Sequence, residues 1–170
     1  MIRNIKKTSL WMALVVFSVF VACNKDEVDE TKPVISDKGI TANPINCQVY
    51  HRGETIPFCY LFEDDTELGS YNIEVHDNSD HHSHSTEGNS HEGNECQEDH
   101  DHDHENGEVG LQHWVFNQSV TIPEGQRSYQ ARLDIVIPNN ILTGDYHFMI
   151  RLTDKAGWQA LKTVAIKIEK

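Results

Sequence analysis

The sequence predicts an all-β protein built as an antiparallel β-sandwich. Apolar residues alternate with polar ones in several short runs, which is the pattern of half-buried strands, and Gly, Pro and Asn separate these runs. Without the long polar insertion described below, the span 33–170 has about 105 residues. An immunoglobulin-like domain has roughly 100 residues, so we expect an immunoglobulin-like β-sandwich of about seven strands with a long, disordered His/Asp-rich insertion.

The alternation predicts individual strands in order along the chain. The clearest runs are 56–62, 71–75, 129–137, 146–152 and 164–168. Between the runs lie segments rich in Gly, Pro and Asn, which favour turns because Gly accepts positive φ and Pro has no N–H to offer a ladder. These turns are expected at 51–54, 123–125, 138–140 and 154–157.

The N-terminus has the pattern of a secretory signal. Three basic residues precede an apolar run at 10–22 that is too short for a membrane span and ends at Cys23. Residues 19–23 resemble the lipobox of bacterial lipoproteins, which implies that Cys23 carries lipid and that 1–22 are removed. Residues 23–32 then form an acidic tether. Lys25-Asp26-Glu27 is similar to a surface-export signal, so we expect an outer membrane lipoprotein on the cell surface or the periplasmic face; a plain signal peptide is the alternative.

The overall charge limits the function. The chain has 14 Lys and Arg against 27 Asp and Glu, a formal charge of −13. A protein this acidic repels phosphates, so we expect no nucleic-acid partner. None of the nucleophile, phosphate-loop or His-Glu-x-x-His motifs occurs in the sequence, and we expect no enzymatic activity.

Most of the histidines gather in one segment. Residues 76–113 hold nine of the 11 His, and the insertion proper is taken as 76–110. No Lys or Arg occurs between Arg52 and Arg127, so the interleaved carboxylates have no cation among them. Apolar residues are nearly missing from 76–108, which favours disorder. Neutral imidazole and carboxylate are ligands of transition-metal dications, so we expect zinc, or alternatively copper or nickel, to bind and order the loop.

The candidate ligands fall into three groups. His76 and His113 lie where the flanking strands end and begin, so they are expected to form the fixed half of a site. His81, His82 and His84 would close over that site, and a second cluster would collect metal because residues two apart in an extended chain project to one side. The candidate ligands are His76, His81, His82, His84, His100, His102, His104 and His113.

Other interpretations of the same segment stay open. It fits a solvated low-complexity spacer, and its imidazoles would also suit a pH sensor. The spacing of the aspartates at 99–103 resembles a calcium loop, but His104 stands where such a loop needs Gly. The main alternative function is an adhesion or accessory module whose sandwich face binds a protein or glycan. In the metal hypothesis the further partners are the membrane, through the lipid, and an envelope protein that receives the ion.

The cysteines leave one pairing to test. Cys47 and Cys59 flank the turn at 51–54, and an envelope location permits a disulfide between them, but alternation places Cys59 on the face opposite Phe58 and Tyr60, so this pairing stays open. Cys96 lies in the insertion, where a soft metal ligand, a free thiol and an intermolecular partner are all open.

The chain as a whole resembles a known family. Residues 144–158, with Tyr146 opening a strand and an Asp-x-x-Gly turn at its end, resemble the last hairpin of extracellular immunoglobulin-like modules. Together with the lipobox and the His-rich stretch after 71–76, residues 31–169 resemble the DUF4625 family of Bacteroidetes lipoproteins. This resemblance implies the immunoglobulin-like fold and an envelope location, and it implies no activity.

Overall fold

The computed structural model describes residues 28–77 and 110–170, and these residues form eight strands and no helix. The strands build two sheets, so the all-β sandwich is confirmed, with one strand more than expected. One sheet has the order β1-β3-β6 and the other the order β2-β8-β7-β4-β5. The strands are β1 (Val34–Ser36), β2 (Gln48–His51), β3 (Thr55–Glu63), β4 (Leu68–Asp77), β5 (Phe116–Thr121), β6 (Ser128–Val136), β7 (Gly144–Asp154) and β8 (Gln159–Glu169).

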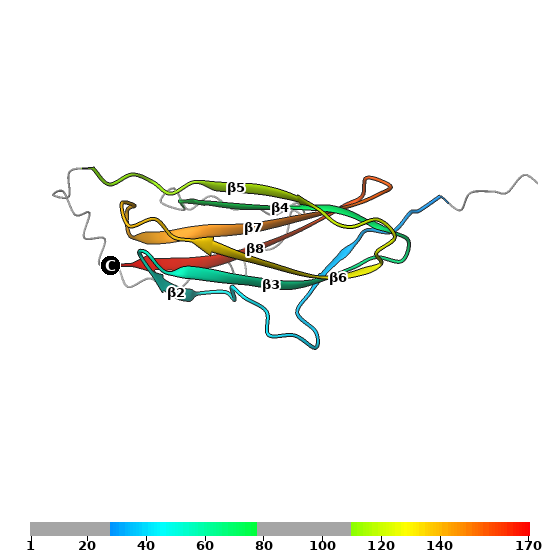
Figure 1. The fold of residues 1–170 in the computed structure, drawn as a ribbon, viewed down its shortest axis with the longest axis horizontal. Coiled ribbons are helices and arrows are strands. Elements are labelled where there is room, and N and C mark those ends of the chain that lie inside the picture. Colours follow the sequence, from blue (N-terminus) through cyan, green and yellow to red (C-terminus); the bar gives the residue numbers. More distant parts are fainter. Residues whose placement is uncertain (1–27, 78–109) are drawn as a thin grey trace, which may run out of the picture.

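Strand pairing is antiparallel with one exception. β3 pairs with β1 on one side and with β6 on the other, and β7 lies between β4 and β8 in the larger sheet. The short edge strand β2 pairs with β8 in parallel. The long strands run along the long axis of the molecule, so most of the turns gather at its two ends (Figure 1).

The core fills the space between the two sheets. The residues that alternation assigns to one face are buried, as in β3, where Ile56, Phe58, Tyr60 and Phe62 are each at most 1% exposed. Phe58 stacks on Phe148 of β7 with ring centroids 5.8 Å apart, which joins the two sheets. Burying one large apolar side chain contributes about 1.5–3 kcal/mol, so this alternation is the main source of stability.

The two ends of the sandwich carry different chemistry. At one end β4 finishes beside the start of β7, with Asp77 opposite Tyr146. We call this the histidine end, defined by His76, His113 and His147. At the other end Leu68 lies opposite Asp154. We call this the acidic end, defined by Asp29, Asp64 and Asp154.

The expected tether reaches the sandwich before β1 begins. Residues 28–32 are among those the structure describes, and the Trp158 indole Nε1 donates a hydrogen bond of 2.9 Å to the carbonyl oxygen of Asp29. The signal segment 1–22, the lipidation site Cys23 and the greater part of the insertion, 78–109, lie outside the described residues.

Candidate functional site

His76 lies on β4 as expected, whereas His113, which was expected to begin the next strand, lies three residues before β5; we call these two residues the root histidines. β4 and β5 are paired, and their last pair is Val75 with Phe116, so His76 and His113 flank the same end of this hairpin. His113 Nδ1 lies 3.0 Å from a carboxylate oxygen of Asp77, and its side chain is 60% exposed. A carboxylate at Nδ1 leaves Nε2 as the nitrogen through which this imidazole could bind an ion.

His76 has its own neighbours. Its Nδ1 lies 3.2 Å from a carboxylate oxygen of Glu74, two residues earlier on the same face of β4. Across the sheet it is paired with His147 of β7, and the two rings meet edge to face with centroids 5.6 Å apart. His147 is buried, although it alternates with the core residues Tyr146 and Phe148.

The two root histidines do not share one site. Successive residues of a strand project to opposite faces, so His76 and Asp77 point to different faces of the sheet. Since His113 contacts Asp77, it lies on the side of the sheet away from His76. Within residues 28–77 and 110–170, the cluster of three or more potential ligand atoms within 4.8 Å of one another lies elsewhere, at the acidic end. The remaining predicted ligands, His81, His82, His84, His100, His102 and His104, lie outside the described residues.

Tyr146, which is paired with Asp77 at the histidine end, has a shifted pKa. Burial raises the pKa of Tyr146 above its ordinary 10.0, and the Asp77 carboxylate raises it further. The Tyr146 hydroxyl donates a 2.7 Å hydrogen bond to the carbonyl oxygen of Leu142. Tyr146 therefore stays protonated and neutral. Among the neighbours of the Asp77 carboxylate is His113.

The structure contradicts the candidate disulfide between Cys47 and Cys59. Cys59 is a free, buried thiol, whereas Cys47 is disulfide-bonded to a cysteine outside the described residues. Cys59 lies on β3 of the smaller sheet, with the Gln130 amide 3.4 Å from its sulfur. Cys47 lies beside β8 of the larger sheet, where its N–H donates to the carbonyl oxygen of Ala165. Cys59 therefore lies in the smaller sheet, whereas Cys47 lies against the larger one. The number of residues in the turn between them does not show this separation.

The aromatic residues do not form a flat exposed platform. Trp114 is only 4% exposed and packs against Phe116 and Tyr146, with ring centroids 6.4 Å and 6.0 Å away. Trp158 is 41% exposed, but it lies at the acidic end, where it bonds to Asp29. Trp114 is therefore core filling rather than a surface for stacking a sugar ring.

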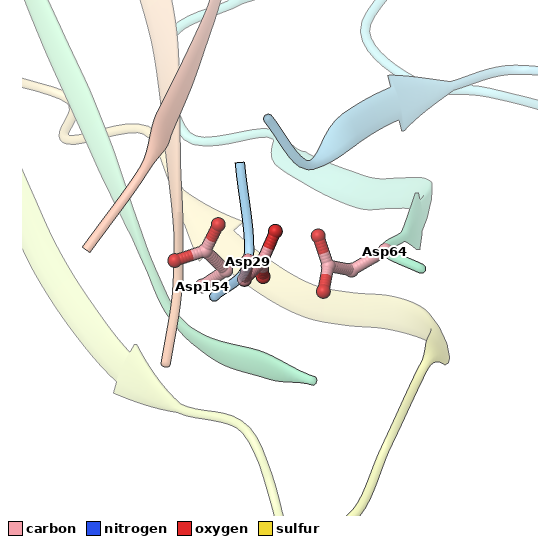
Figure 2. A group of neighbouring side chains, drawn as sticks. All are labelled: Asp29, Asp64 and Asp154. Atoms are coloured by element: carbon pink, nitrogen blue, oxygen red, sulfur yellow. The ribbon is translucent and has the colours of Figure 1, made fainter. Parts of the chain in front are cut away.

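Sequence reasoning missed the three aspartates of the acidic end. Asp29 lies in the expected tether, Asp64 follows β3, and Asp154 ends β7. An oxygen of each lies within 4.8 Å of an oxygen of the other two (Figure 2). The sequence signals were the turn-forming Asp-x-x-Gly at 154–157 and the pair at 64–65, which indicate turns rather than a common site.

Comparison with known families places the chain. The profile of a family described as a domain of unknown function (DUF4625) matches residues 21–169. The chain belongs to this family. Among curated proteins, none matches this DUF4625 chain. Within its described residues, no helix is long and apolar enough to cross a membrane.

Proposed function

We propose that this DUF4625 protein binds a divalent transition metal, zinc foremost and copper or nickel as alternatives, through the His-rich segment 76–113. The ion would be acquired, buffered or delivered to an envelope partner. The binding site would lie at the histidine end, where this segment leaves β4 and rejoins the sandwich before β5.

One observation carries the proposal. His113, whose side chain is 60% exposed, has a carboxylate oxygen of Asp77 3.0 Å from its Nδ1. A carboxylate at this position fixes the tautomer, so that Nε2 presents its lone pair, and it raises the basicity of the ligand. In metal sites this arrangement accompanies most ligating histidines.

The composition of the segment supports the same chemistry. It adds seven histidines between 78 and 109 and interleaves them with acids, without a single Lys or Arg. Because His76 and His113 lie on different faces of the sheet, the His-rich segment would have to supply the other ligands of an ion bound to one of them. Zinc sites need three or four such ligands, and binding would couple metal affinity to ordering of the loop.

We also propose that the sandwich is immunoglobulin-like and that the chain is an outer membrane lipoprotein anchored at Cys23. Tyr146 supports the first part, because it lies near the start of the penultimate strand and its hydroxyl bonds back to Leu142, as in the tyrosine corner of immunoglobulin domains. The lipobox-like residues 19–23 support the second part. The alternative is an adhesion or accessory module that binds a protein or glycan, and the burial of Trp114 speaks against the glycan only.

Equilibrium dialysis against zinc tests the proposal. The full chain, purified in detergent and stripped with a chelator, is compared with a variant lacking 78–108 and with Asp77→Asn. We expect the deletion to abolish tight zinc binding. Losing a carboxylate that supports a ligand typically weakens metal affinity by about 10–100-fold, and we expect this loss for Asp77→Asn.

His51 offers a matched control. It lies on β2, at the opposite edge of the same sheet, and its Nδ1 is 3.3 Å from a carboxylate oxygen of Glu54. His51→Gln therefore removes an imidazole that also has a carboxylate near Nδ1, but from the edge of the sheet opposite β5, and zinc affinity should not change. Equal zinc uptake with and without 78–108 would refute the proposed function.

A further inference from the structure

A second group of potential ligands lies at the acidic end, on the far side of the sandwich from the proposed zinc site. Asp29 belongs to the segment before β1, Asp64 follows β3, and Asp154 is the last residue of β7. Figure 2 shows their carboxylates side by side, and one oxygen of each lies within 4.8 Å of the others. Three formal negative charges therefore meet at one point.

Backbone donors hold one oxygen of each carboxylate in place. These bonds fix the carboxylates before any ligand arrives, and each uses only one of the two oxygens. The bonds are Thr31 N–H to Asp29 Oδ1 at 3.0 Å, Thr66 and Glu67 N–H to Asp64 Oδ2 at 2.9 and 2.7 Å, and Gly157 and Trp158 N–H to Asp154 Oδ1 at 2.6 and 2.8 Å.

The other oxygen of each carboxylate has no partner. Asp29 Oδ2, Asp64 Oδ1 and Asp154 Oδ2 are closed off from water and accept no hydrogen bond. Asp154 as a whole is only 4% exposed. Burying an unpaired charged oxygen costs several kcal/mol unless something compensates it, so three such oxygens together favour the binding of a cation.

Within residues 28–77 and 110–170, no basic side chain supplies that compensation. Among the described residues, neither Lys, Arg nor His forms an ion pair with any of the three aspartates. The lysine nearest in sequence, Lys155, has its ammonium 4.0 Å from Glu67 and 3.9 Å from Glu124 instead. The charge at this end is therefore left to a ligand from solution.

We infer that Asp29, Asp64 and Asp154 form a calcium site. The three side chains offer carboxylate oxygens, which suit a hard cation and not zinc or copper. Ca²⁺ takes oxygen ligands at about 2.3–2.6 Å, so two oxygens on one ion are at most about 5 Å apart, which agrees with the spacing of this cluster. Waters and backbone carbonyls would complete the six to eight ligands that Ca²⁺ takes.

The site joins the N-terminal segment to the sandwich. Apart from the ion, this segment is held here by the Trp158 bond to Asp29 and by a hydrogen bond from the Thr31 hydroxyl to Asp65. Calcium would add ionic bonds between Asp29 and two residues of the sandwich. The inference does not rest on the proposed zinc function, because it uses other residues at the other end.

Thermal unfolding of the chelator-treated full chain tests the inference. At 10 mM Ca²⁺, about a hundredfold above the dissociation constant of roughly 10⁻⁴ M found in extracellular modules, we expect the midpoint to rise by about 5–10 °C. Asp154→Asn and Asp29→Asn should both remove this rise. Asp29→Asn alters only the segment before β1, so it reports on the site even if Asp154→Asn fails to fold.

Two further arms separate the sites. Asp134→Asn, on an exposed position of β6, is the matched control and should keep the full rise with calcium. The variant lacking 78–108 should also keep it, whether or not that variant still binds zinc. No rise in the unaltered chain would overturn the inference, as would a rise that persists in Asp29→Asn or disappears with the deletion.

Discussion

Replacing Gly69 with Ala should destabilise the protein through one backbone contact. Gly69 is the extra residue of an irregularity in β4, between Leu68 and Ser70. A Cβ at this position would lie 2.8 Å from the carbonyl oxygen of Asp154 and 2.9 Å from that of Thr153. Both atoms belong to the backbone of β7, so no side chain can rotate away, and β7 must move by about half an ångström. Such overpacking costs about 1–3 kcal/mol.

Urea unfolding of the full chain measures this cost. With a slope of about 2 kcal/mol per molar urea, the midpoint for Gly69→Ala should fall by about 0.5–1.5 M. Ser70→Ala, at the next position, is the control and should stay within about 0.5 kcal/mol of the unaltered chain. Because the displaced strand carries Asp154, Gly69→Ala should also reduce the calcium-dependent rise in midpoint. A free energy of unfolding unchanged to within about 0.5 kcal/mol would refute the contact argument.

Two other predictions concern side-chain chemistry. We expect Cys96 to be the partner of Cys47, because Cys23 is the proposed lipidation site and Cys59 is free; a non-reducing peptide map checks this, and a link to Cys59 would contradict the structure. Burial raises the pKa of both Tyr50 and Tyr60 from 10.0 to about 12. The unfolded chain therefore loses these protons first, so stability should be complete below pH 10 and fall between pH 10 and 12, by up to about 3 kcal/mol for each tyrosine. Unfolding curves across this range check the fall, and a flat response would show that the hydroxyls reach water.

The long strands could be predicted because burial leaves a period-two pattern that needs about five residues to recognise. β3 and β7 have nine and 11 residues, and their core faces were assigned correctly. β1 and β2 have only three and four residues, too few to show a period-two pattern. Both are edge strands, so one side of each is open to solvent. Their pairing, including the parallel contact of β2 with β8, depends on tertiary structure.

Of the two candidate sites, one could be predicted in part from the sequence and the other could not. His76 and His113 could be placed near each other at one end of two neighbouring strands, because a loop between two antiparallel strands returns close to where it left, although His113 lies three residues before β5. The orientation of these two histidines to different faces depends on the pairing register of β4 and β5, which cannot be predicted from the sequence alone. The acidic end could not be predicted, since Asp29, Asp64 and Asp154 are separated by 35 and 90 residues and meet only when β3 and β7 end at the same place.

The position of Asp29 bears on how the protein would stand above a bilayer. Asp29 lies six positions after Cys23 in the sequence, which limits the distance between them to about 20 Å. β7 alone, with 11 residues, spans about 36 Å from the acidic end to the histidine end. With Cys23 acylated, the acidic end would therefore face the headgroups, and the imidazoles would be held several Debye lengths out, beyond the layer of counterions that an anionic surface concentrates. Metal arriving from the surrounding medium, rather than from the membrane surface, would then be the pool that these imidazoles sample.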